Sequence, residues 1–375
     1  MKCIVNGNLV VKHGVVQGNL LIEGDRIVKV GAHIPAGEII DAHGAYVAPG
    51  FIDIHTHGRA GSDAMYPTLH DLDTISRATL QTGVTAFLPT TMTMPVPDLT
   101  RAVQNIAENQ ERVTGARVLG IHLEGPFFNK RYKGAQPEEC LLPPAVEHYE
   151  SFVGAHGALI KKISLAPELD PDLAFVRYAV GQGVVVSLGH TDATYAQAQA
   201  AIDAGATSTT HTFNAMSPLT HRAPGVVGAA MVNDSVYAEL ILDGIHVDYA
   251  AAKALLRAKG SDKVVLVTDS MEAAGLPDGQ YKIGTQAVFV KNHCARLADG
   301  TLAGSVAAMN TMVHNAHRHL GLPLHEAVNL ASGNPAASLG ESRLGEIKAG
   351  NVADLVFFDE EIRIQQVMVN GELRL

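Results

Sequence analysis

Cysteine is scarce in this chain of 375 residues, and long apolar runs are absent from it. Its three cysteines, Cys3, Cys140 and Cys294, have unrelated spacings, which excludes a disulfide framework and a thiolate zinc site. No stretch reaches the ~18 apolar residues that a membrane-spanning helix needs, and the start of the chain lacks the apolar segment of a signal peptide. We therefore expect a soluble, cytoplasmic protein with reduced thiols and no membrane partner.

Positive charge is also in short supply. The chain has 28 lysines and arginines against 38 aspartates and glutamates, a formal net charge of −10. Nucleic-acid binding needs a basic face, so this balance argues against DNA or RNA as a partner. A small anionic substrate remains compatible with it, because such a ligand needs only one or two local cations.

Three common catalytic motifs are missing from any strand–turn–helix context. The chain has no Gly-x-Ser-x-Gly elbow, no Walker loop and no dinucleotide-binding glycine fingerprint there. These absences exclude serine hydrolases, nucleoside triphosphatases and Rossmann dehydrogenases.

Histidines and carboxylates occur instead at the ends of apolar runs that we interpret as β-strands. The first motif is His55-Thr-His57, close behind Pro49-Gly-Phe-Ile-Asp53. Four more follow: His122-Leu-Glu124-Gly-Pro126, Gly189-His190-Thr-Asp192, His211-Thr-Phe-Asn214 and Thr268-Asp269-Ser270. One His-x-His pair would be a weak signal, because alternate residues of a strand share a face for packing reasons too. Five such motifs at five strand ends indicate a hydrolytic metal site.

Strand and helix patterns alternate from residue 50 onward and favour a (β/α)8 TIM barrel, an α/β fold. The predicted strands cover residues 52–57, 84–91, 117–124, 163–168, 184–190, 208–213, 238–245 and 264–269. Helical windows between them include residues 71–82, 99–113, 194–204 and 249–259. Gly83, Gly205 and Gly260 follow three of these windows and can provide left-handed caps. The alternative is a doubly wound open sheet, which would not bring eight strand ends to one point.

Both ends of the chain have shorter strand patterns. They cover residues 2–5, 9–11, 19–23, 26–30, 38–41, 345–350, 354–358 and 366–371. Asn6-Gly7 and Gly24-Asp25 supply hairpin-turn chemistry between some of them. Neither end is long enough to bury a core alone. We predict that residues 1–49 and 343–375 form one small discontinuous β-domain, a β-sandwich, and that residues 50–342 form the catalytic barrel.

The strand-end motifs provide ligands for a divalent metal ion. Glu124, His190 and His211 form an oxygen–nitrogen set that suits zinc, iron, manganese or cobalt and leaves a position open for water. His55 and His57 either complete a second metal position, with Glu124 bridging, or act as hydrogen-bonding neighbours of a single metal.

Polar residues near the last three strand ends are candidates for proton transfer and substrate binding. Asp269 is placed to accept a proton from the attacking water and return it to the leaving group, although it could instead cap the following helix. Arg222 is the residue type that best binds a phosphate or carboxylate, but alone it could equally be a solvated loop cation. Asn214 and His246 lie near the same strand ends.

Residues 49–57 together with the strand-eight aspartate resemble the amidohydrolase superfamily. Within it, six motifs resemble the family of N-acetylglucosamine-6-phosphate deacetylases. These motifs are His122-Leu-Glu-Gly-Pro-Phe127, Leu165-Ala-Pro-Glu168, Gly189-His-Thr-Asp192, His211-Thr-Phe-Asn-Ala-Met216, Asp243-Gly-Ile-His246 and Val267-Thr-Asp269. The likeness runs in order over residues 45–345. Other superfamily branches place a carboxylated lysine at the end of strand four. Here Lys161 and Lys162 lie at the beginning of that strand, so Glu124 is the natural acidic ligand.

The resemblance implies a homodimeric enzyme that hydrolyses the acetamide of N-acetylglucosamine 6-phosphate to glucosamine 6-phosphate and acetate. Such an enzyme acts in amino-sugar catabolism and cell-wall sugar recycling and holds one or two divalent metal ions per subunit. Glu124, His190 and His211 would bind the catalytic metal, and Asp269 would activate water and protonate the amine. The implied substrate-binding residues are Ala135, Gln136, Asn214, Ala215, Arg222, His246, Leu302, Ala303 and Gly304.

Some of these implied roles are more specific. Arg222 would reach the phosphate from the neighbouring subunit, and residues 302–304 would line the acetyl pocket. Gln136 lies where some relatives have a histidine, so it can donate a hydrogen bond but cannot carry a charge. Two alternatives remain. One is another hydrolase of the superfamily that acts on N-acyl amino acids or cyclic amides, and the other is a non-catalytic binding protein whose barrel has lost its enzymatic activity.

Overall fold

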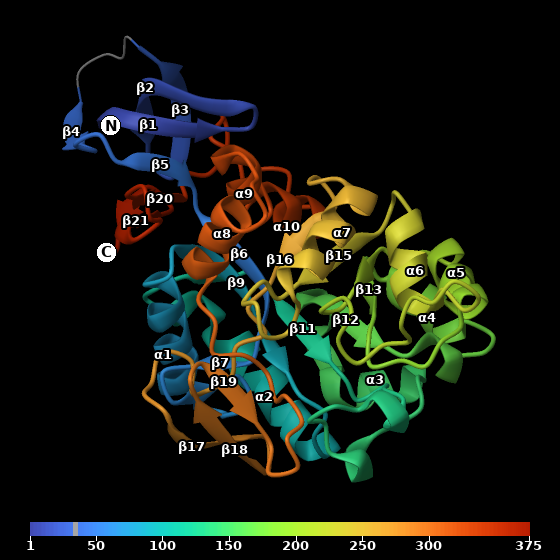
Figure 1. Ribbon diagram of the computed structural model, residues 1–375. Coiled ribbons are helices and arrows are strands. Elements are labelled where there is room, and N and C mark those ends of the chain that lie inside the picture. The colour runs from blue at the N-terminus through green and yellow to red at the C-terminus, as the bar shows by residue number, and fades with distance from the viewer. Residues whose placement is uncertain (33–36) are drawn as a thin grey trace.

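The computed structural model describes residues 1–32 and 37–375, and a ring of parallel strands lies at its centre (Figure 1). The ring consists of β6 (Phe51–Thr56), β9 (Val84–Thr91), β11 (Ile121–Glu124), β12 (Ile160–Leu165), β13 (Val185–Leu188), β14 (Ser208–Thr209), β15 (Tyr237–Leu240) and β16 (Val264–Leu266). A hydrogen bond from Asp269 N to His55 O, at 2.8 Å, joins the end of the last strand to the first. The predicted barrel is confirmed, and the open sheet is excluded.

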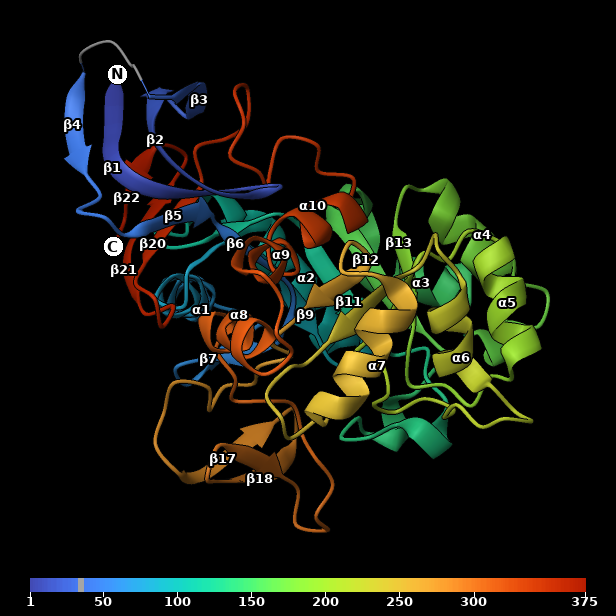
Figure 2. The same ribbon diagram turned by 45° about the horizontal axis from the view of Figure 1, so that its top comes forward.

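Helices surround the strand ring (Figure 2). They are α1 (Leu69–Leu80), α2 (Val96–Asn109), α3 (Val146–Val153), α4 (Ala174–Gly181), α5 (Tyr195–Asp203), α6 (Gly225–Val232), α7 (Tyr249–Lys259), α8 (Met309–Arg318), α9 (Leu324–Asn329) and α10 (Gly333–Ser338). Because helices cover the outside, the strands bury both faces, and every residue of β6 and β9 is buried. Gly83, Gly205 and Gly260, after α1, α5 and α7, have positive φ angles of +84°, +110° and +78°, which favour glycine. The left-handed cap predicted at Gly260 is wrong, because its ψ of 157° lies outside that conformation.

Four barrel strands end earlier than predicted at the functional motifs. The expected strands 184–190, 208–213, 238–245 and 264–269 end at residues 188, 209, 240 and 266. His190, His211 and Asp269 follow these ends with φ angles of +50°, +31° and +47°. Non-glycine residues rarely adopt this left-handed region, and it costs on the order of 1 kcal/mol or more. The motifs are therefore tight turns at the barrel mouth and not continuations of the strands.

The third and fourth strands also differ from the prediction. Residues 117–124 are divided into β10 (Arg117–Val118) and β11, and both parts pair with β9. The fourth strand, expected at residues 163–168, begins earlier, as β12. This shift places Lys162 inside the strand, where the side chain is fully buried.

The two ends of the chain pair into one sheet beside the barrel (Figure 1). Its strands are β1 (Lys2–Val11), β2 (Gly14–Glu23), β3 (Arg26–Gly31), β4 (Glu38–Asp41), β5 (Tyr46–Pro49), β20 (Leu355–Phe358), β21 (Ile364–Val369) and β22 (Glu372–Leu373). The turn predicted at Gly24-Asp25 is confirmed between β2 and β3. The turn predicted at Asn6-Gly7 is wrong, because β1 continues through a bulge at which Asn6 has a φ of +56°.

Strand β20 shows how the terminal sheet and the barrel are joined. Leu355 and Phe357 pack in a cluster that belongs to the terminal sheet. Val356 and Phe358, on the opposite face, pack in the core cluster of the barrel. Because alternate residues of a strand face opposite ways, one short strand contributes to both cores. The sandwich form and the division at residues 49 and 343 stay predictions.

A small antiparallel sheet between β16 and α8 was not predicted. It consists of β17 (Gly279–Ile283), β18 (Gln286–Lys291) and β19 (Cys294–Arg296) and lies at the lower edge of the molecule in Figure 1. A second short hairpin, β7 (Gly58–Arg59) with β8 (Ser62–Asp63), follows the first barrel strand. Across the described residues, no helix combines the length and apolar character needed to cross a membrane.

Candidate active site

The barrel mouth gathers four histidines and two carboxylates from five strand ends or the turns that follow them. They are His55, His57, Glu124, His190, His211 and Asp269. All six side chains are buried, and Asp269, the most open of them, is only 8% exposed. Buried carboxylates and imidazoles need charge partners, so this clustering has an electrostatic purpose.

Glu124 lies at the centre of the cluster. Its Oε1 atom is 3.1 Å from His211 Nε2 and 3.3 Å from both His190 Nε2 and His55 Nε2. Its Oε2 atom is 3.1 Å from His57 Nε2. Two groups of candidate ligands therefore meet at one carboxylate. The first group is Glu124 with His190 and His211, and the second is His55 and His57 with Asp269.

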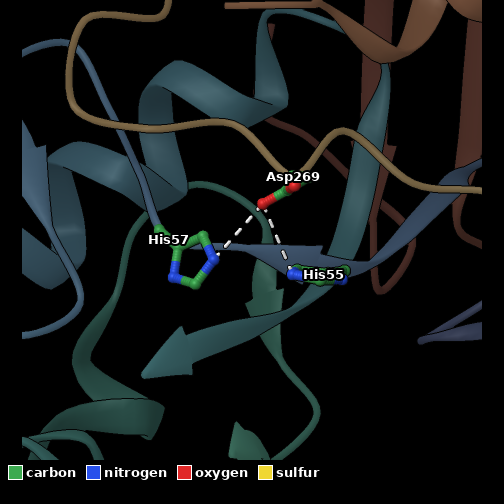
Figure 3. Close-up of side chains that lie close together, drawn as sticks. All are labelled: His55, His57 and Asp269. Atoms are coloured by element: carbon green, nitrogen blue, oxygen red, sulfur yellow. Dashed lines mark ion pairs between the residues drawn. The ribbon is translucent and has the colours of Figure 1, made fainter. Parts of the chain in front are cut away.

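Figure 3 shows the second group, in which the side chains of His55 and His57, at the end of β6, point toward Asp269. Its Oδ1 atom is 3.4 Å from His55 Nε2 and 3.3 Å from His57 Nε2. Asp269 thus faces the same space as Glu124. This placement agrees with the position expected for a proton acceptor, although the role itself stays a prediction.

The hydrogen bonds of the imidazole rings test whether a metal ion fits here. The Nδ1 atoms of His57, His190 and His211 lie 3.2, 2.8 and 3.1 Å from backbone carbonyl oxygens. Carbonyls only accept, so each Nδ1 carries the proton, and in the neutral ring Nε2 has a lone pair. These lone pairs face the Glu124 carboxylate, and the Nε2 atoms of His190 and His211 lie only 3.1 Å apart. Acceptors that face one another at such distances need a cation between them, so the residues fit a divalent metal.

His55 gives the same result. Its Nε2 atom is buried and has no hydrogen-bond partner in the described part of the chain. Its Nδ1 atom lies 3.1 Å from the carboxylate of Glu239. The ring is thus oriented with a free nitrogen toward the centre of the cluster.

The surrounding charges keep both carboxylates of the cluster ionised. Burial alone would raise the pKa of Glu124, but when no metal ion is bound the protonated imidazoles of His55, His190 and His211 take the place of the cation and lower it well below its usual value. Burial likewise opposes ionisation of Asp269, but His55 and His57 lower its pKa. Ionised carboxylates are the forms that bind a metal ion or accept a proton.

Glu239 and Lys162 are functional candidates that we did not predict. Glu239, in β15, accepts from His55 Nδ1 and, at 3.0 Å, from the backbone N–H of His211. Lys162, in β12, forms an ion pair with Glu239, and both side chains are fully buried. The available sequence signal was charge within apolar strands, Glu239 in β15 and the pair Lys161 and Lys162 in β12, because a buried charge is rare unless it is paired.

A cavity of about 320 Å³ opens in front of the cluster. Seven of the predicted substrate-binding residues line it: Ala135, Gln136, Asn214, Ala215, His246, Leu302 and Gly304. Ala303 does not, because it packs in the apolar cluster beneath β17–β19. Arg222 is exposed and does not line the cavity of a single chain. Arg131, which we did not predict, lines it and lies 2.8 Å from Asp192.

Two of the lining side chains are held by specific contacts. Gln136 donates to Glu124 Oε2 at 2.9 Å and accepts from Thr93 N at 2.8 Å, which fixes the orientation of its amide. The His246 Nδ1 atom lies 2.7 Å from Asp243 Oδ2. Burial opposes protonation of His246, but this carboxylate outweighs burial and raises the pKa of His246 above its usual value.

Comparisons with known proteins agree with this geometry. The amidohydrolase family model matches residues 46–374. The N-acetylglucosamine-6-phosphate deacetylase of Bacillus subtilis is 39% identical, over 99% of this chain and 95% of that protein. The N-acetylgalactosamine-6-phosphate deacetylase of Escherichia coli O157:H7 is 35% identical, over 97% of each chain.

Solved structures give the same result. The N-acetylglucosamine-6-phosphate deacetylase of Pasteurella multocida has a TM-score of 0.94 at 33% identity and covers 99% of each chain. A mutant of the Mycobacterium smegmatis enzyme in complex with N-acetyl-D-glucosamine-6-phosphate has a TM-score of 0.93 at 34% identity, over 100% of this chain and 99% of that one. The resemblance found in the sequence motifs is confirmed.

Proposed function

The chain belongs to the amidohydrolase family, and from that premise we propose that it deacetylates N-acetylglucosamine 6-phosphate. The products are glucosamine 6-phosphate and acetate, which places the reaction in amino-sugar catabolism and cell-wall sugar recycling. The observation that carries the proposal is the pair of ligand groups that share Glu124 in front of a cavity. Two deacetylases of phosphorylated amino sugars are 39% and 35% identical to this chain over nearly its full length, and this similarity supports the substrate class.

The histidines and Glu124 would hold one or two divalent ions of zinc, iron, manganese or cobalt, with Glu124 between the two groups. When bound, such an ion lowers the pKa of water and polarises a carbonyl oxygen. Gln136 keeps the Glu124 carboxylate oriented, and the Nδ1 hydrogen bonds keep the imidazole nitrogens turned inward. The protein thus supplies a preformed set of ligands.

Asp269 would carry the proton in the reaction. Its ionised carboxylate faces the centre of the cluster and lines the cavity, so it can accept a proton as water attacks the acetyl carbonyl. The new C–O bond forms, the C–N bond breaks, and the same proton passes from Asp269 to the leaving nitrogen. This transfer avoids expulsion of an amine anion.

Asn214, Ala215 and His246 would contact the phosphorylated end of the substrate. The cationic form of His246 is favoured by Asp243, and it lies at the cavity wall. We place Arg222 at the phosphate as well, donated by the second subunit of a cytoplasmic homodimer. This arrangement is supported by the exposure of Arg222 and its position outside the cavity of a single chain.

Acetate release from a small panel of amides tests the proposal. The metal-loaded protein is expected to release acetate fastest from N-acetylglucosamine 6-phosphate, more slowly from the unphosphorylated sugar, and not at all after treatment with a chelator. N-acetylgalactosamine 6-phosphate belongs in the panel because a relative carries that name. Faster turnover of N-acyl amino acids or cyclic amides would replace the proposal with another hydrolase. Absence of turnover in a metal-replete sample would indicate a binding protein.

A further inference from the structure

A second cavity, of about 680 Å³, lies beside the active site and shares none of its lining residues. Its wall includes Arg59 of β7, Asp243 after β15, and residues 306–308 before α8. Cavities of 300–1,000 Å³ are typical of small-molecule sites. The reaction proposed above makes no use of this space.

Arg59 is the side chain that makes the cavity unusual. It is 6% exposed, and its Nη1 atom donates to Ala307 O at 3.0 Å. Among the described residues, no carboxylate forms an ion pair with its guanidinium within 4.0 Å, although the charge of the buried Asp53 acts on it from farther away. Its Nε and Nη2 atoms donate to no described protein atom. Gly275, on the same wall, has no side chain to cover Nε; even a Cβ built there would lie 4.0 Å away. The unused donors therefore face the cavity.

A guanidinium in this position is costly for the fold. It has five N–H donors and a permanent charge, and burial without a partner removes hydration that a single carbonyl does not replace. Asp243 does not neutralise it, because its carboxylate is occupied by His246 Nδ1 and by the backbone N–H groups of Ile245 and His246. The described lining of the cavity has no other arginine and no lysine, and its second carboxylate, Asp278, accepts from the backbone N–H of Asn292 at 3.1 Å.

We infer that this cavity binds a small organic anion, whose phosphate or carboxylate group is held by the free edge of the Arg59 guanidinium. Phosphate and carboxylate oxygens match the parallel N–H pair that Nε and Nη2 present. The cavity volume leaves room for a sugar-sized body beyond the anionic group. Arg59 follows His57 by two residues, yet the ligand would remain outside the active-site cavity. The inference does not depend on deacetylation.

Thermal unfolding of the metal-loaded protein tests this site, with inorganic phosphate and acetate as probes against sodium chloride at equal ionic strength. The variant is Arg59→Met, and the matched control is the double variant Arg222→Met with His246→Gln, which removes the two cations that the proposed function places at the substrate phosphate. Phosphate or acetate at ten times its Kd is expected to raise the Tm of the wild type and the control by about 2 °C. Arg59→Met is expected to lose the part of the rise that the control keeps, and the more effective anion identifies the group that binds.

The Tm without added anion separates a binding role from a structural one. Removal of an unpaired buried charge is neutral or stabilising, so Arg59→Met should unfold at the same or a higher temperature than the wild type. A lower Tm together with an unchanged response to both anions would overturn the inference and make Arg59 a structural link to Ala307. If Arg59→Met does not fold, Arg59→Lys replaces it as the test variant. Lysine keeps the positive charge but loses the two parallel N–H donors, so the rise in Tm caused by phosphate or acetate should be smaller than in the wild type. An undiminished response would overturn the inference.

Discussion

The two groups of candidate ligands that meet at Glu124 are held in place by different parts of the molecule. In the group with His190 and His211, the Nδ1 atoms donate to the carbonyls of Tyr132 and Asn214, at 2.8 and 3.1 Å. Both carbonyls belong to residues that line the active-site cavity. The geometry of this group therefore depends on the loops that surround the cavity.

The group of His55, His57 and Asp269 is held from inside the barrel. His55 Nδ1 contacts the Glu239 carboxylate, and His57 Nδ1 contacts the Thr90 carbonyl, at 3.1 and 3.2 Å. Neither Glu239 nor Thr90 lines the cavity. This difference shows that changes in the loops around the cavity should alter the positions of His190 and His211, whereas the barrel interior determines the positions of His55 and His57. Variants should therefore separate substrate binding from metal binding.

The largest effect is expected from His211→Ala. It removes a candidate ligand and the ring that holds the loop at Asn214, so the variant should lose bound metal and nearly all turnover. Binding of glucosamine 6-phosphate should weaken too. His55→Ala should lose metal without that weakening. Elemental analysis and product binding check both variants.

Stoichiometric metal and a near-normal rate in His211→Ala would refute the ligand assignment. In the wild type, metal supplementation should yield more than one ion per chain, because both groups are intact. A limit of one ion would make His55 and His57 hydrogen-bonding neighbours of a single metal.

Asp269→Asn is expected to have the next largest effect and distinguishes chemistry from metal binding. The amide keeps the size of the carboxylate but cannot shuttle a proton, so kcat should fall by roughly 10²–10⁴, the range that general acid–base groups supply. Metal content and substrate affinity should stay close to those of the wild type. A tenfold loss or less, with metal retained, would show that another residue carries the proton.

Glu239→Gln sharpens the comparison, because it acts on the second group from inside the barrel. The variant loses the ion pair with Lys162 and the strong acceptor for His55, so metal affinity should fall by roughly 10–100-fold. The double variant Glu239→Gln with Lys162→Met removes the unpaired charge and should recover stability. It should not recover metal affinity. Recovery of both would mean that Glu239 acts only through folding stability.

The smallest effect is expected at Asp243, outside both groups. Asp243 raises the pKa of His246, so cationic binding of the phosphate is present below that raised pKa and is lost as pH rises through it. In Asp243→Asn the loss should begin at a lower pH. Between the two pKa values, KM for the phosphorylated substrate should be roughly fivefold higher than in the wild type, with kcat little changed. Superimposable KM profiles against pH would contradict this role of His246.

Much of the fold could be predicted because its determinants are local. Apolar runs, glycines after helices and motifs at strand ends are visible over a few residues, and they led to the barrel and to Glu124 with the five residues around it. The boundaries were less accurate. His190, His211 and Asp269 were expected inside strands, whereas they occupy left-handed turns just beyond them.

What the sequence determined by itself is the order of elements and the set of metal-ligand types at their ends, since both follow from residue spacing. The tertiary structure alone decided which charges are paired. Lys162 and Glu239 lie 77 positions apart and meet only because the barrel closes, and among the described residues Arg59 is left with a backbone carbonyl but no ion-pair partner for the same geometric reason. The energy of a buried charge depends on its neighbours in space, and spacing along the chain does not specify those neighbours.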